Sequence, residues 1–290
     1  MLMGYDSVLA VLRRRGQVPI LKAKLTDLLI PLERQDPVMT GDDFKRFLVL
    51  FGRQSFRKTV RRLLSAHGGA VPVGVLESIA GDRAGEYLEF LASIGVARRN
   101  ADGTTGMTRA IDNIGPTLEW YVAELCEREL DGDAEWAVQL ENLPVGGDFD
   151  VLAWLAPTLL SVELKSGQPP EIPDSELRNF LQRDQELAPD MSVLLIDTDN
   201  AAGVQALVQR MNDFVMPLVG APNSQPTFNA QRDFPGVVFG WRRVYVTGSH
   251  PSIITQLRRA LQHYHARVKG HAFWGGPTVN FVTGKVGSPD

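Results

Sequence analysis

Apolar and polar positions follow two different periods along this chain, and the two periods predict two kinds of element. Apolar residues recur every three or four positions within residues 55–66, 73–79 and 83–94, which is typical of amphipathic helices. They alternate with polar residues within 146–154 and 159–165, which is typical of strands. We therefore expect an α/β protein whose N-terminal part is mainly helical.

The N-terminal residues are expected to form a basic helical arm. A helix is predicted over about residues 5–32, broken near 16–19, and a second helix is predicted to start after Thr40, whose hydroxyl can cap it, and to end near Gly52. The expected domains are this arm at 1–52, a second module at 53–112, and an α/β domain at 113–290 that ends in a basic extension.

The module at 53–112 has three predicted helices followed by two short extended segments, 96–100 and 104–109, which are joined at a good turn, Ala101-Asp102-Gly103. This order resembles a winged helix-turn-helix domain. The helix that would enter the major groove, 83–94, is acidic, which favours dimerisation or domain packing over sequence recognition. Basic side chains elsewhere in the module could still contact phosphates: Arg57, Lys58, Arg61, Arg62, Arg98 and Arg99.

The two strands at 146–154 and 159–165 are separated by so few residues that they should form an antiparallel hairpin. A symmetric loop pairs residues whose numbers sum to 313, so Asp150 is expected to face Glu163, and Asp148 to face Lys165. An asymmetric loop would shift this register by one residue.

The alternation also sorts the faces of this hairpin. One face is wholly apolar and must look into a core: Phe149, Val151, Ala153, Leu160, Val162 and Leu164. The other face carries Leu152, Trp154 and Ser161 and, at one end, the charged residues. Two carboxylates held opposite each other repel unless a cation lies between them. Mg²⁺ suits this arrangement, since it takes one or two carboxylates and keeps several waters.

Asp150, followed on the next strand by Glu163-Leu164-Lys165, resembles the PD-(D/E)xK signature of the restriction-endonuclease-like nucleases. Phe149 stands where proline often precedes the aspartate. The resemblance implies a mixed sheet flanked by helices, with Mg²⁺ or Mn²⁺ held by Asp150, Glu163 and the carbonyl of Leu164. It implies that Lys165 orients or deprotonates the attacking water, or offsets charge on the phosphate. It also implies an acidic residue from a preceding helix, for which Glu119 within 115–125 is the candidate.

The segments that follow fit the same fold. Asp174 can cap a helix over about 175–187, and 191–197 reads as a buried strand, so strand, helix and strand should form a right-handed parallel crossover. Arg178 and Gln182 share one face of that helix with Gln185 and are candidate phosphate contacts, although a solvated polar stripe is the alternative.

Farther along, 237–247 predicts one more strand, and Pro251 opens a helix. Its outer face carries Arg258 and Arg259, which either contact phosphates or are simply solvated.

Composition narrows the function without fixing it. The net charge of −4 divides into +7 over residues 1–70, −17 over 71–200 and +6 over 201–290, so basic flanks could hold a polyanion, unless the clustering is chance. The single cysteine, Cys126, excludes an internal disulfide and a multi-cysteine zinc site and fits the cytoplasm. The apolar runs are too short to span a membrane, and the start shows no secretory segment.

The resemblance to the PD-(D/E)xK nucleases implies a Mg²⁺- or Mn²⁺-dependent phosphodiesterase. We expect an endonuclease rather than an exonuclease, acting on DNA rather than RNA, in a role such as defence or repair. A homodimer is compatible with the sequence. Two alternatives stay open: a non-enzymatic winged-helix DNA-binding regulator, and a subunit that is active only within a larger nuclease complex.

Overall fold

The computed structural model describes residues 6–30, 40–219, 229–230, 238–241 and 243–268. The chain divides into two compact units, each described by itself: unit 1 comprises Met1–Lys22 and Val122–Asp290, and unit 2 comprises Ala23–Tyr121. Helix α6 (Gly115–Leu130) runs across the boundary between them. This division differs from the expected boundaries, because the N-terminal arm is shared between the units.

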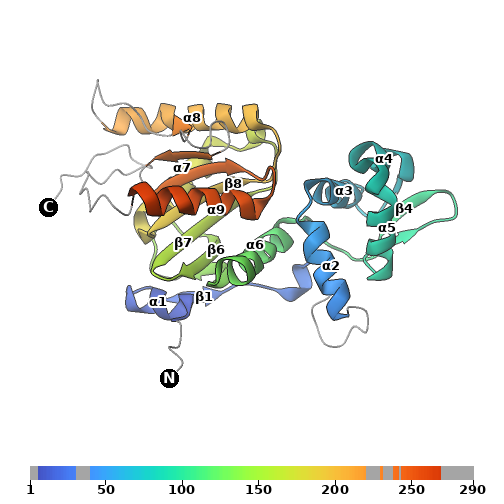
Figure 1. The fold of residues 1–290 in the computed structure, drawn as a ribbon, viewed down its shortest axis with the longest axis horizontal. Coiled ribbons are helices and arrows are strands. Elements are labelled where there is room, and N and C mark those ends of the chain that lie inside the picture. Colours follow the sequence, from blue (N-terminus) through green and yellow to red (C-terminus); the bar gives the residue numbers. More distant parts are fainter. Residues whose placement is uncertain (1–5, 31–39, 220–228, 231–237, 242, 269–290) are drawn as a thin grey trace. The chain divides into compact units, whose positions relative to one another are not determined.

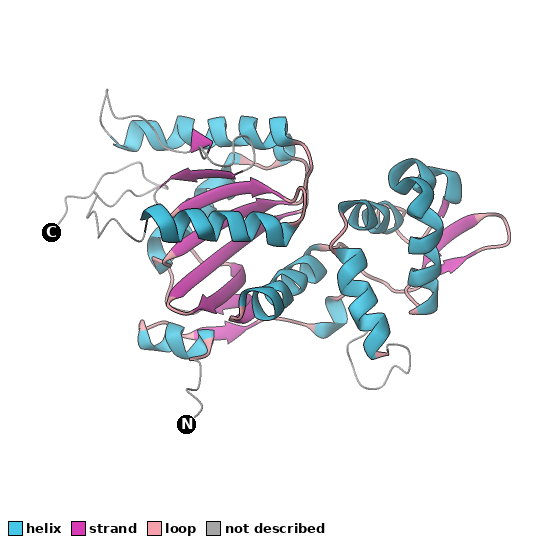
Figure 2. Ribbon diagram, in the orientation of Figure 1, coloured by secondary structure: helices cyan, strands magenta, loops and turns pink. Residues whose placement is uncertain are grey.

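Unit 1 is built on an eight-stranded mixed sheet in the order β1-β5-β6-β7-β8-β11-β10-β9. Strand β8 pairs parallel with β7 and with β11, and the other pairs are antiparallel. Figure 2 shows the strands as a continuous layer with helices over it. The α/β expectation is thus confirmed. The strands are β1 (Pro19–Leu21), β5 (Asp133–Leu140), β6 (Asp148–Leu155), β7 (Thr158–Lys165), β8 (Met191–Ile196), β9 (Asn229–Ala230), β10 (Val238–Trp241) and β11 (Val244–Gly248).

The β6–β7 hairpin has the register expected from the sequence. Val151 pairs with Val162 and Leu155 with Thr158, so the paired numbers sum to 313 and two residues form the turn. The parallel pairing of β7 with β8 across helix α7 (Asp174–Leu187) is also confirmed. Asp174, however, is the first residue of α7 rather than its cap; Pro173 stands at the N-cap, and the Asp174 carboxylate pairs with Arg210.

Helices cover both faces of the sheet. On one face α7 and α8 (Ala201–Val219) pack on β8, β10 and β11, with Phe180, Leu194 and Met211 in a shared core. On the opposite face, α9 (Ile253–His263) crosses the strands beside the second half of α6, to which Arg258 bonds at Glu129 (Figure 1).

The hairpin face that carries the charged residues is also buried along most of its length. Leu152 and Leu159 share a core with Val8 and Leu12 of α1 (Val8–Arg14). Helix α1 lies about 140 residues before the hairpin in the sequence, so no local pattern predicts that α1 packs against β6 and β7.

Unit 2 is a helical unit with a small sheet. Its three strands are antiparallel, in the order β2-β4-β3, and its core is aromatic, with Phe47, Phe56 and Phe90 in mutual contact. Thr40 caps α2, as expected, and Asp43 completes a reciprocal capping box that was not predicted. The elements are η1 (Leu25–Asp27), α2 (Gly41–Phe51), α3 (Gln54–Leu64), β2 (Ala70–Pro72), α4 (Val73–Ala80), η2 (Gly81–Arg83), α5 (Ala84–Ser93), β3 (Ala97–Arg99) and β4 (Thr104–Met107).

Several expectations about individual elements are wrong. Among the described residues of the helix predicted over 5–32, only α1 and the short 3₁₀ turn η1 are helical. Strand β1 joins the sheet beside β5, and both ends of the predicted helix lie outside the described residues. The strand predicted over 237–247 is a hairpin, β10 and β11. Unit 1 also contains two short helical segments, η3 (Pro169–Glu171) and η4 (Tyr264–Val268). Across the residues described, no helix has the length and hydropathy needed to cross a membrane.

Candidate metal centre

Three charged side chains meet at the open end of the β6–β7 hairpin, away from its turn. The register places Asp150 opposite Glu163, one step beyond the last paired residues, Val151 and Val162. There the Oδ2 atom of Asp150 accepts a hydrogen bond of 2.6 Å from the backbone N–H of Leu164. The Nζ atom of Lys165 lies 3.0 Å from Oε1 of Glu163. Side chains of opposite charge therefore converge as the sequence predicts.

Lys165 is held as an ammonium ion. Burial acts to lower its pKa, but the charge of Glu163, hydrogen bonds to Glu176 and Glu163, and the charge of Asp150 outweigh burial and raise the pKa above the ordinary lysine value. At neutral pH this side chain carries its proton. It can therefore orient a water or offset negative charge, and it is poorly suited to act as a base.

Helix α7 adds two charged residues that the sequence analysis missed. Glu176 Oε2 lies 2.8 Å from Nζ of Lys165, and Nη2 of Arg183 lies 2.7 Å from Oε1 of Glu163. The Arg183 and Glu163 side chains are 13% and 6% exposed, so this ion pair is largely shielded from water. Glu176 and Arg183 are seven positions apart, which puts them on one face of α7. The sequence shows this shared face, but it does not show that the face turns toward β7.

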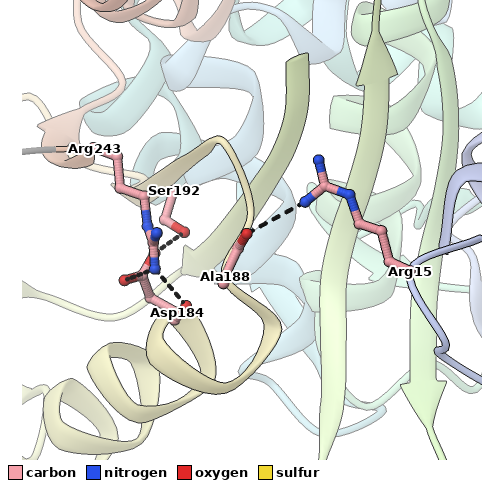
Figure 3. Close-up of polar contacts among 5 residues, drawn as sticks. All are labelled: Arg15, Asp184, Ala188, Ser192 and Arg243. Carbon is pink, nitrogen blue, oxygen red and sulfur yellow. Dashed lines mark hydrogen bonds and ion pairs between the residues drawn. The ribbon is translucent and has the colours of Figure 1, made fainter. Parts of the chain in front are cut away.

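The C-terminal end of α7 is fixed to the sheet by a polar network (Figure 3). Asp184, directly after Arg183, accepts hydrogen bonds from Oγ of Ser192 in β8 at 2.7 Å and from the guanidinium of Arg243. Arg15 donates to the carbonyl of Ala188 and pairs with Asp190 at 2.8 Å. These contacts set the position of α7 along the strands and hence that of Arg183.

The donor set suits a hard cation. In the described residues no group of three or more His, Cys, Asp and Glu side chains is arranged for a metal ion. Asp150, Glu163 and the Leu164 carbonyl would instead supply two carboxylates and one carbonyl, a partial oxygen set of the kind that Mg²⁺ completes with water and that zinc disfavours. Both cations that contact Glu163 make their closest approach at Oε1.

The other predicted site residues lie in several places. On α7, the Arg178 guanidinium lies over the Phe214 ring at 4.4 Å, and Gln182 donates to Glu186 at 2.8 Å, so both side chains have partners within unit 1. Asp148 is exposed and pairs in register with Gln139 of β5. On the other side of β6 the pairing with β7 ends at Val151 and Val162, so the position of Asp148 opposite Lys165 stays a prediction.

Four more predicted basic contacts are on α3 and α9. On α3, Arg61 is half-buried, and Arg62 is exposed and donates to Ser65. On α9, Arg258 pairs with Glu129 at 2.8 Å, and Arg259 is half-buried. Their proposed roles with nucleic acid stay predictions.

Glu119 lies in the first half of α6, which belongs to unit 2. Its membership of the site therefore also stays a prediction.

No protein-family model matches this chain, and no curated protein matches it. Among solved structures, the chain is similar to the crystal structure of protein VC1899 from Vibrio cholerae, with 11% sequence identity and a TM-score of 0.43. The similarity covers 91% of this chain and 62% of that one, so the chain spans less than two thirds of that protein. A likeness this distant decides nothing about the site.

Proposed function

We propose that this chain is a nuclease that hydrolyses phosphodiester bonds with a divalent cation, Mg²⁺ or Mn²⁺, at Asp150, Glu163 and Lys165. The observation that carries the proposal is the convergence of these three side chains at the open end of one hairpin, with Lys165 Nζ 3.0 Å from Glu163 Oε1. An incidental Glu-x-Lys pair would not explain why Asp150, on the opposed strand, accepts a hydrogen bond from the backbone N–H of Leu164.

Each residue has a role that follows from its charge and place. Asp150, Glu163 and the Leu164 carbonyl would hold the cation. When bound, such a cation lowers the pKa of coordinated water and stabilises charge on the phosphate. Lys165, kept protonated by its acidic neighbours, would hold the attacking water or neutralise a non-bridging phosphate oxygen. The electrostatic role is favoured over that of a general base, because the pKa of Lys165 is raised.

Unit 2 fits a nucleic-acid-binding module of the winged-helix type. The order α3, β2, α4, α5, β3, β4 and the sheet order β2-β4-β3 resemble those of a winged helix and support this proposal. Within it, α5 is acidic, and Glu86 is already paired with Arg53 at 3.1 Å. Arg98 and Arg99 of β3 are exposed. We infer that such a module would contact the phosphate backbone through β3 rather than read bases through α5.

The test is cleavage of a substrate panel by the full chain. Single-stranded, double-stranded and branched DNA, and RNA, are incubated with Mg²⁺ or Mn²⁺. Wild type and Lys45→Ala, whose exposed ammonium belongs to unit 2, are expected to cleave at equal rates. Lys165→Ala is expected to lose about 10²-fold or more of the rate while keeping its fold by circular dichroism. A wild-type chain inert with every metal and substrate would instead favour a non-enzymatic binding protein.

A further inference from the structure

Glu163, a proposed metal ligand, already contacts two positively charged side chains. Its Oε1 atom contacts Nζ of Lys165 at 3.0 Å and Nη2 of Arg183 at 2.7 Å. A divalent cation that binds Glu163 must approach two cations already in place. An opposite charge within about 4–6 Å lowers the proton affinity of a carboxylate by roughly 10-fold or more, and the same repulsion acts on any incoming cation.

Arg183 is built into this position rather than resting on the surface. Its side chain is 13% exposed, and the Cβ that any other residue would place at Gly147 would lie 3.3 Å from Nη1. Gly147 also has a positive φ of 81°, which favours glycine. The loop before β6 thus approaches the guanidinium closely. Within the described residues, Nε of Arg183 is buried without a hydrogen-bond partner, so the guanidinium is incompletely hydrogen-bonded in this position.

The local charges balance only when metal and phosphate are both present. Glu163 and Glu176 are linked by ion pairs to Lys165 and Arg183. Asp150 bonds to the backbone N–H of Leu164, next to Glu163, and counting it gives three carboxylates against two cations, a net charge of −1. A divalent cation alone changes this to +1. A phosphodiester, with one negative charge, then restores neutrality.

We propose that Arg183 competes with the divalent cation for Glu163 and, once a polynucleotide arrives, pairs with its phosphate instead. The inference rests on the proposed function. It makes Arg183 a positioning residue that couples the two ligands: metal binds weakly to the chain alone and more tightly with a phosphodiester present. Arginine suits this exchange, because its planar fork pairs equally well with carboxylate and phosphate. Reciprocity requires the metal to tighten binding of the polynucleotide by the same factor.

The first test measures the affinity of the full chain for Mn²⁺ without nucleic acid, from the electron paramagnetic resonance signal of free Mn²⁺. Arg183→Gln is expected to bind Mn²⁺ about 10-fold more tightly than wild type, because one repelling charge is gone. The matched control is Arg14→Gln, which also removes an arginine from a 2.7 Å ion pair in unit 1, but at an exposed site. It is expected to match wild type. An Arg183→Gln variant that binds Mn²⁺ no more tightly would overturn the competition.

The second test adds a phosphorothioate oligonucleotide, which resists hydrolysis. Wild type is expected to gain Mn²⁺ affinity by about 10-fold or more, and Arg183→Gln to gain much less. Equal gains in both proteins would show that Arg183 does not couple the two ligands.

A third measurement keeps the proposal testable if Arg183→Gln does not fold. In the wild-type chain, the Nε–H resonance of Arg183 is followed by NMR and assigned by its absence in Arg183→Lys. Saturating Mg²⁺ is expected to shift this resonance, and the shift is expected to be absent in Asp150→Asn. Mn²⁺ binding with an unmoved Arg183 resonance contradicts the competition but leaves the nuclease proposal standing. No Mn²⁺ binding by any variant at millimolar concentration refutes both.

Discussion

Replacing Glu163 by glutamine should destabilise unit 1 far more than a surface substitution of the same kind. The change keeps the size of the side chain but leaves the guanidinium of Arg183 and the ammonium of Lys165 without the carboxylate that both contact, at 2.7 and 3.0 Å. The Arg183 and Lys165 side chains are 13% and 20% exposed, so water compensates little for the lost carboxylate. Removing one partner of a buried ion pair typically costs about 3–5 kcal/mol, and Lys165 retains Glu176, so we expect about 3 kcal/mol.

The assay is differential scanning calorimetry without divalent cations, beside a matched control. Glu129→Gln makes the same chemical change in an ion pair of 2.8 Å with Arg258, but there the side chains are 48% and 47% exposed. Exposed pairs contribute below about 1 kcal/mol, so the control should melt within about 3 °C of wild type. Glu163→Gln should lower the transition by roughly 6–12 °C. Equal small shifts in both variants would refute the claim that this end of the hairpin is a shielded ion network.

Four further predictions follow from single residues. The pKa of Lys165 is raised above the unfolded value of 10.5, so its ion pairs stabilise the folded chain fully below that value. This contribution is lost as the pH rises through the higher pKa of the folded state. The difference in stability between wild type and Lys165→Met, measured by urea denaturation, should therefore be constant from about pH 7 to 9 and shrink above about pH 11. Asp150→Asn retains an oxygen that can accept the Leu164 N–H, so its urea midpoint should stay close to that of wild type while calorimetric Mn²⁺ binding is lost, and a variant that binds Mn²⁺ normally counts against the site. Asp184→Ala leaves the guanidinium of Arg243 without its carboxylate and removes the acceptor of Ser192 Oγ, so it should lower the unfolding free energy by roughly 2–4 kcal/mol. A loss below about 0.5 kcal/mol would mean that this network does not hold α7 in place. Burial, reinforced by the nearby charge of Glu127, raises the pKa of the Cys126 thiol to about 12, so a disulfide reagent should modify it only after denaturation, and prompt modification of the native chain would contradict its burial.

The hairpin could be predicted in detail because its constraints are local. The alternation over 146–154 and 159–165 fixes which side chains share a face, and the short connection fixes the register that pairs Val151 with Val162. The same kind of alternation is present in β5, where Ala134, Trp136, Val138 and Leu140 are the buried residues, and it was overlooked.

The part of the site contributed by α7 could not be read in the same way. The apolar stripe of this helix, which includes Phe180 and Leu187, shows which side is buried. It does not show whether Arg178 or Arg183, on opposite borders of that stripe, turns toward β7. The answer depends on contacts far apart in sequence, such as Asp184 with Arg243 and Ala188 with Arg15 (Figure 3). These contacts decide which side of the apolar stripe of α7 faces β7, and the periodicity of the sequence alone does not.

The central claim is that Asp150 and Glu163 share one divalent cation beside an ammonium group. The most direct measurement is an anomalous difference map from crystals of the full chain soaked in Mn²⁺. The account predicts a peak between the carboxylates of Asp150 and Glu163, within coordination distance of the Leu164 carbonyl, and no such peak in Asp150→Asn. A fully soaked wild-type crystal with no peak there, or with Mn²⁺ bound only at other carboxylates, would contradict it.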